Sequence, residues 1–106
     1  MTVTAIVPTL NEERNILECL QSLAWADSRV VFDCYSDDGT IEVARRAGAQ
    51  VLQHPFENFA QFHNAAMERV EARWILFVDA DERVTPELAA EIKTVTNEDR
   101  PEVLWY

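Results

Sequence analysis

Hydrophobic and polar positions alternate along the chain in blocks that fit buried strands and amphipathic helices. Five short apolar runs, most of them rich in β-branched residues, predict strands at residues 3–9, 29–33, 49–54, 73–79 and 102–106. Between these runs, apolar residues recur at helical spacing and predict helices over residues 11–26, 40–48, 58–72 and 85–95. This alternation predicts an α/β fold, in which helices flank a mostly parallel, Rossmann-like sheet.

Capping residues mark the predicted start of three helices. Asn11 stands where it would cap the first helix, and Asn58 pairs with Gln61 at the spacing of a capping box. Thr85 precedes Pro86, which suits the first position of a helix because it needs no backbone N–H there.

Composition limits the size and the partners of the chain. With 106 residues, 48% of them hydrophobic, it is one domain at most. A formal net charge of -10 argues against a nucleic-acid partner, which would require a basic face. An anionic ligand would therefore need a bridging cation. The chain ends on apolar and aromatic residues, in the predicted strand 102–106. This predicts that 1–106 is one truncated domain whose exposed edge strand could form a homodimer.

The two cysteines, Cys19 and Cys34, have no partner at metal-binding or redox spacing. They are therefore interpreted as free thiols in a reducing compartment, which predicts a cytoplasmic protein. No apolar stretch approaches the length of a transmembrane helix.

Polar residues gather where the predicted strands end. Asn11 follows the first strand, Asp33 ends the second, and Asp79 and Asp81 end the fourth. Ligands of open parallel sheets bind at the carboxyl ends of the strands, where the strand order reverses. If the first and fourth strands are neighbours, these four residues line one crevice.

The chain has neither a G-x-G-x-x-G fingerprint nor a P-loop, so a phosphate group would be held through a metal ion. In extended chain the carboxylates of Asp79 and Asp81 would point to the same side. Carboxylates are hard ligands that suit Mg²⁺ or Mn²⁺. Taken alone, the acidic pair is equally compatible with a solvated turn. Asp33 alone is more simply explained as a strand-end turn residue, and Asn11 as a helix cap.

Four segments in order resemble a known family: "TAIVPTLNEERNILECLQSL", "VVFDCYSDDGTIEVARRAGAQV", "NFAQFHNAAMERV" and "WILFVDADERVTPEL". They are similar to the family 2 inverting glycosyltransferases of bacteria, which have the GT-A fold. The greater similarity is to the branch that builds lipopolysaccharide cores and other envelope glycans. The resemblance implies the N-terminal, nucleotide-sugar-binding part of such an enzyme.

The resemblance implies roles for single residues. The residues implied to bind the nucleotide are Pro8, Thr9, Asn11, Glu12, Asp33, Asn64 and Asp79. Asp81, with Asp79, is implied to hold Mg²⁺ or Mn²⁺ on the diphosphate. The implied partners are a nucleotide-sugar donor, with uracil the commonest base in the family, and a glycan or lipid-linked acceptor. A lipid-linked acceptor would place the protein at the inner face of the cytoplasmic membrane.

The chain also departs from the family pattern. Cys34 and Tyr35 replace the small or acidic residues common after Asp33, and His63 replaces the basic residue common before Asn64. Family members continue well past residue 106, so no residue is assigned here as the catalytic base, and the chain alone is expected to be inactive.

There are two alternatives to the glycosyltransferase interpretation. One is a non-catalytic nucleotide-binding fragment. The other is a Mg²⁺-dependent phosphatase of the haloacid dehalogenase type, which also carries D-x-D at a strand end. The phosphatase motif belongs on the first strand, whereas this one is on the fourth.

Overall fold

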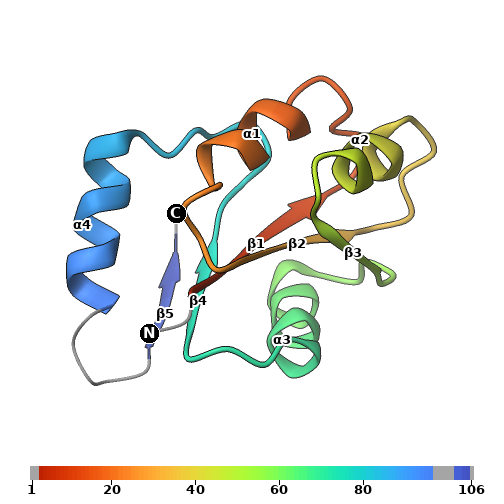
Figure 1. Ribbon diagram of the computed structural model, residues 1–106. Helices are drawn as coiled ribbons and strands as arrows, with labels where there is room; N and C mark the ends of the chain where they lie inside the picture. The colour runs from red at the N-terminus through yellow and green to blue at the C-terminus, as the bar shows by residue number, and fades with distance from the viewer. Residues whose placement is uncertain (1–2, 97–101, 106) are drawn as a thin grey trace.

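The computed structural model describes residues 3–96 and 102–105. The strands are β1 (Val3–Thr9), β2 (Ser28–Asp33), β3 (Gln50–Gln53), β4 (Trp74–Phe77) and β5 (Glu102–Trp105). The helices are α1 (Ile16–Ser22), α2 (Thr40–Arg46), α3 (Phe59–Arg69) and α4 (Pro86–Thr96). Strands and helices alternate along the chain, as predicted (Figure 1).

The sheet has the strand order β3-β2-β1-β4-β5, and every neighbouring pair is parallel. This confirms the predicted α/β class. The chain runs from β1 outward to β2 and β3, then crosses back to β4 on the other side of β1. The strand order therefore reverses between β1 and β4, where an open sheet forms its ligand crevice.

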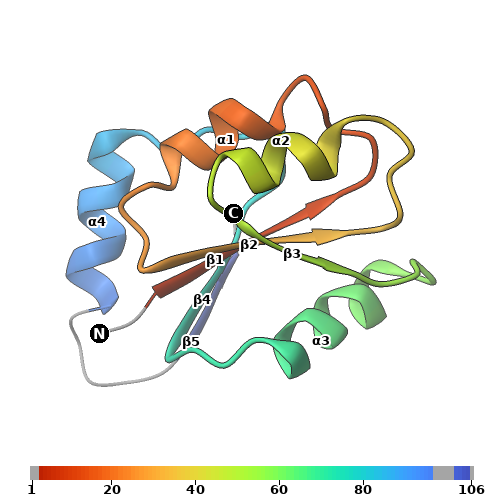
Figure 2. The same ribbon diagram turned by 45° about the vertical axis from the view of Figure 1, so that its right-hand side comes forward.

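Helices cover both faces of the sheet, with α1 and α2 on one face and α3 on the other (Figure 2). Successive side chains of a strand point to opposite faces of the sheet, so a strand can contribute side chains to the hydrophobic core on each face. In β1, Ala5 and Val7 pack with residues of α1, α2 and α4, whereas Ile6 packs with residues of α3. All three side chains are fully buried. Burial of a Val or Ile side chain contributes about 1.5–3 kcal/mol.

Two of the predicted caps are confirmed. The Asn58 side chain accepts the Gln61 backbone N–H at 2.8 Å, and the Thr85 hydroxyl accepts the backbone N–H of Leu88 at 3.1 Å. Pro86 is the first residue of α4, as expected.

The prediction for the start of α1 is wrong. The helix begins at Ile16 rather than after Asn11, because residues 12–15 form a separate turn in which the Glu12 carbonyl accepts from the backbone N–H groups of Asn15 and Ile16. Asn11 has a φ of 55° and caps no helix. Asparagine tolerates this left-handed conformation better than most residues.

Candidate functional site

Asp33 joins the ends of three strands at the carboxyl edge of the sheet. Its carboxylate accepts from the Thr9 hydroxyl at 2.6 Å, the Ser36 hydroxyl at 2.5 Å and the Ser36 N–H at 2.8 Å. The Gln53 amide lies 3.4 Å from the same carboxylate. Asp33 is 0% exposed. Its oxygens are thus engaged by groups of this chain, which hold together the carboxyl ends of β1, β2 and β3.

Asn11 contacts the loop that follows β2. Its backbone N–H donates to the Ser36 hydroxyl at 2.8 Å, and its side-chain oxygen accepts the Asp37 N–H at 2.9 Å. This loop, and not a helix end, is the partner of the Asn11 side chain. The two strand-end loops therefore form one hydrogen-bonded unit.

Glu12 extends this unit to the start of α2. Its backbone N–H donates to the Thr40 hydroxyl at 2.9 Å. The Thr40 hydroxyl and backbone N–H both donate to Asp38. The hydroxyl bond is the main cause that lowers the pKa of the Asp38 carboxyl. The Glu12 carboxylate accepts from the Asn15 amide at 3.1 Å.

The acidic segment after β4 is a tight turn. β4 ends at Phe77, and the Glu82 N–H donates to the Asp79 carbonyl at 2.9 Å. In return the Glu82 carboxylate accepts the Asp79 N–H at 2.9 Å. The expectation of an extended D-x-D is therefore wrong, because these two hydrogen bonds close the chain into a turn. Asp79 and Asp81 are exposed, whereas Ala80 between them is buried.

The carboxylates of this turn repel one another. Desolvation raises the pKa of the Asp79 carboxyl, Glu82 and Asp81 raise it further, and His63 acts in the opposite direction. A cation between Asp79 and Asp81 would relieve this repulsion, so the donor set fits a hard divalent ion. Within residues 3–96 and 102–105, no three His, Cys, Asp or Glu side chains are arranged to hold a metal. Further ligands would have to come from a bound phosphate and from water.

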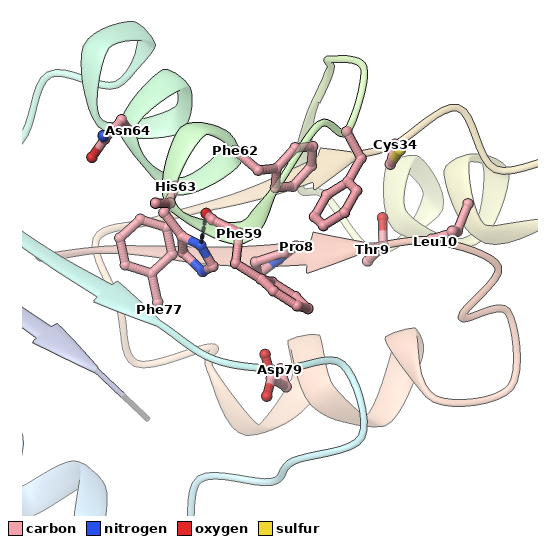
Figure 3. A pocket seen from close by; sticks show the side chains of 12 residues that line it. Pro8, Thr9, Leu10, Cys34, Phe59, Phe62, His63, Asn64, Phe77 and Asp79 are labelled. Atoms are coloured by element: carbon pink, nitrogen blue, oxygen red, sulfur yellow. Dashed lines mark hydrogen bonds between the residues drawn. The ribbon is translucent and has the colours of Figure 1, made fainter.

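A pocket of about 790 Å³ opens at the same edge of the sheet, between the ends of β1 and β4 and helix α3. Asp79 lies on one side of it and the rings of Phe59 and His63 on the other (Figure 3). The residues that line it are Pro8, Thr9, Leu10, Cys34, Phe56, Phe59, Ala60, Phe62, His63, Asn64, Phe77 and Asp79.

The pocket includes half of the residues that the sequence singles out. Pro8, Thr9, Asn64 and Asp79 line it, whereas the others do not: Asn11, Glu12, Asp33 and Asp81. Asp33 contacts the pocket indirectly, through the hydroxyl of Thr9.

The sequence reasoning missed the aromatic wall. Phe56, Phe59 and Phe62 are three residues apart and contribute rings from the first turn of α3 and from the segment just before it. The Phe56 and Phe59 rings meet edge to face at 5.2 Å, and the Phe59 side chain is 75% exposed. The His63 ring packs against the Phe77 ring, with 4.6 Å between the ring centroids. The spacing of the three phenylalanines was the available signal, but it is also that of a buried helix face.

The fold and this edge define an open α/β protein whose pocket lies at the reversal of strand order, with an apolar wall opposite a carboxylate. A protein-family model described as glycosyl transferase family 2 matches residues 4–105. The chain belongs to this family. The assignment removes the ground for the phosphatase alternative.

Individual relatives agree with the family. The chain is 31% identical over 102 residues to an uncharacterised glycosyltransferase of Rickettsia prowazekii, covering 92% of this chain and 35% of the relative. It is 28% identical over 116 residues to the poly(ribitol-phosphate) β-N-acetylglucosaminyltransferase TarS of Staphylococcus aureus, covering 98% of this chain and 20% of TarS. The chain thus spans about a third or less of the length of these relatives.

Solved structures show the same fold. Glucosyl-3-phosphoglycerate synthase of Mycobacterium tuberculosis, in complex with UDP, superposes with a TM-score of 0.75 at 21% identity, over 92% of this chain and 41% of that one. S. aureus TarS gives a TM-score of 0.71 at 28% identity, over 92% of this chain and 32% of that one. The chain has the N-terminal part of the GT-A fold.

Proposed function

We propose that this chain is the donor-binding part of an inverting glycosyltransferase that transfers a sugar from a nucleoside diphosphate, a UDP-sugar, to a glycan. The observation that carries the proposal is the position of Asp79, which joins the acidic turn to the pocket at the reversal of strand order in a family 2 chain. The mycobacterial synthase, whose structure with UDP and Mn²⁺ has the same fold, supports the choice of donor.

The pocket would hold the nucleoside against its apolar wall. Pro8 and Thr9 form the end of β1, and Asn64 lies on the α3 side. Asp33 takes part by fixing the Thr9 hydroxyl, to which it is bonded at 2.6 Å. We assign Asn11 and Glu12 to the border of the site, since their loop contacts hold the end of β1 in place.

The acidic turn would hold the diphosphate through Asp81 and Asp79. Mg²⁺ or Mn²⁺ bound there would stabilise the charge that develops on the leaving diphosphate. The two carboxylates would thereby hold the diphosphate of the donor in a fixed position. No residue is assigned as the catalytic base.

Calorimetric titration with UDP, with and without Mn²⁺, tests this proposal. Wild-type protein should bind UDP more tightly when Mn²⁺ is present, and Asp81→Ala should lose that gain. The matched control is Asp37→Ala, which removes an exposed carboxylate from another turn at the same edge. UDP binding that responds neither to Mn²⁺ nor to Asp81→Ala refutes the assignment of the metal site.

A second function that we propose for these residues is nucleotide binding without sugar transfer, because the pocket and the acidic turn account for donor binding whereas no described residue is assigned as the catalytic base. Incubation with UDP-sugars and a panel of glycan acceptors distinguishes the two. Binding without transfer or donor hydrolysis supports the second function, and transfer by the 106-residue chain excludes it.

For the acceptor we propose an envelope glycan or a lipid-linked sugar, met in the cytoplasm at the inner face of the membrane. The relative TarS is a poly(ribitol-phosphate) β-N-acetylglucosaminyltransferase, whose name gives a polymer as the acceptor. Among the described residues, no helix has the length and apolarity needed to cross a bilayer. Transfer to a soluble glycan but to no lipid-linked acceptor would argue against the membrane location.

We also propose a homodimer through the edge of the sheet. In the described part of the chain β5 pairs with β4 on one side, which leaves its other edge open to a second strand. Sedimentation velocity over a range of concentrations tests this. A single monomeric species at every concentration would contradict it.

A further inference from the structure

Arg83 directly follows the acidic turn and forms hydrogen bonds both within the turn and to a neighbouring part of the fold. Its Nη1 donates to the carbonyls of Ala80 and Glu82, each at 2.8 Å. Its Nη2 and Nε reach α1 and the segment before it, at Asn15 Oδ1 (3.3 Å) and Glu18 Oε2 (3.4 Å). We propose that Arg83 is a positioning residue, which fixes the Asp79–Glu82 turn against this region and so sets the spacing of the two metal-binding carboxylates.

The guanidinium holds the turn by its main chain and leaves the ligand groups free. In the described part of the chain, the hydrogen bonds shown for Arg83 go to carbonyls, to Asn15 and to Glu18, and none goes to Asp79 or Asp81. A guanidinium presents several donors in a rigid fork, so one side chain can hold two carbonyls and a neighbouring element at once. Arg83 therefore holds the turn without occupying the carboxylate oxygens of Asp79 and Asp81 that would bind a cation.

The arginine also connects the turn to the other half of the site. Asn15 accepts from Arg83 with its amide oxygen and donates to the Glu12 carboxylate with its amide nitrogen, at 3.1 Å. One amide thus joins the loop after β1 to the turn after β4, across the point where the strand order reverses. The Arg83 side chain is 32% exposed; its bonds to Ala80, Glu82 and Asn15 are partly buried, whereas the bond to Glu18 is exposed.

Glu82 completes the arrangement from inside the turn. Its carboxylate is engaged by the Asp79 backbone N–H, while its carbonyl accepts from Arg83. Side chains that orient metal ligands without touching the metal commonly account for a 10- to 100-fold effect on metal affinity. We expect a loss of that order, about 10-fold or more, when the Arg83 fork is removed.

The experiment measures Mn²⁺ affinity in the presence of UDP, by electron paramagnetic resonance of free Mn²⁺, together with the melting temperature of the metal-free protein. The variants are Arg83→Gln, which removes the charge and the fork, and Arg83→Lys, which keeps the charge alone. Arg46→Gln is the matched control, because Arg46 forms an exposed ion pair with Glu42 on α2 at 2.7 Å, away from the turn.

Affinity should fall strongly in Arg83→Gln, less in Arg83→Lys, and not at all in Arg46→Gln. A lower melting temperature with unchanged Mn²⁺ affinity, measured well below melting, would show a merely structural role and overturn the inference. If Arg83→Gln does not fold, Arg83→Lys decides between a clear loss and wild-type affinity.

This inference rests on the proposed function, and the wild type separates the two. No Mn²⁺ binding by wild-type protein with UDP overturns the proposed function and the inference together. Metal binding by the wild type that persists unchanged in both Arg83 variants overturns the inference alone.

Discussion

The network around Asp33 allows a quantitative test of what holds the floor of the site. Asp33→Ala removes the acceptor of four donor groups, which come from Thr9, Ser36 and Gln53. Asp33 and Thr9 are buried, and the bonds from Ser36 and Gln53 are partly buried, so water has limited access to these groups in the folded protein. The two hydroxyls can rotate toward other acceptors, but the Ser36 N–H is fixed by the backbone.

The magnitude follows from these differences. A buried donor left unpaired costs about 1–3 kcal/mol, and each hydroxyl bond that is lost costs roughly a further 1 kcal/mol. We expect Asp33→Ala to lower the free energy of unfolding by about 3–5 kcal/mol. The free energy of unfolding of a whole domain is typically about 5–15 kcal/mol. The melting temperature should fall by at least 12 °C, at about 4–8 °C per kcal/mol.

Urea and thermal unfolding, followed by far-ultraviolet circular dichroism, measure this loss. Asp33→Asn keeps the shape, and its amide can accept from Ser36 and donate to the two hydroxyl oxygens, so it should cost about 1 kcal/mol. Asp37→Ala, an exposed neighbour, should change stability by no more than about 0.5 kcal/mol. A loss below about 1 kcal/mol in Asp33→Ala would refute the view that this carboxylate holds the three strand ends together.

Three further predictions concern the pocket and its surroundings. Because the pKa of Asp79 is raised above 3.8 in the folded state, its ionised form destabilises the fold as pH rises through that pKa. The metal-free Asp79→Asn variant should therefore have a higher melting temperature than the wild type at neutral pH, and this difference should vanish below pH 3.8. A lower melting temperature of the variant at neutral pH would contradict this. Phe62→Ala removes a ring that is 3% exposed and should cost about 3–5 kcal/mol in urea unfolding, whereas a cost near zero would show that the aromatic core closes over the gap. Burial raises the pKa of the Cys19 thiol to about 11. Iodoacetamide at pH 8 (roughly the ordinary thiol pKa) should therefore label Cys34 alone in the folded protein. Equal labelling of both cysteines, measured by mass spectrometry, would disprove the burial of Cys19.

The elements of the fold were predictable because their signals are local and agree with one another. Apolar runs and capping residues specify the strands and the starts of α3 and α4. The start of α1 was not predictable, since Asn11 and Glu12 carry helix-start signals that the loop after β2 uses instead. Which donor an asparagine side chain accepts from depends on a contact across 26 positions of sequence, which no local pattern contains.

The candidate site was predictable at its acidic edge and not at its apolar wall. Parallel strands bring their carboxyl ends together, so polar residues after β1 and β4 must be neighbours once the strand order is known. Phe56 and Phe59 reach the same pocket from the other face of the sheet. Whether such rings face a core or a cavity depends on the packing of α3, and the periodicity of the sequence is the same in both cases.

The scarcity of glycine explains how the strand-end loops are built. Loops that bind phosphate often use glycine for left-handed turns, but this chain has only two glycines. At the ends of β1 and β2 the left-handed positions are Asn11 and Tyr35, with φ of 55° and 49°. A tyrosine in this conformation is strained, and such strain persists only where the surroundings enforce it. Ser36, bonded to Asp33 and to the Asn11 backbone, supplies that constraint, so the two loops hold one conformation through side-chain hydrogen bonds where a glycine-rich loop would rely on its backbone.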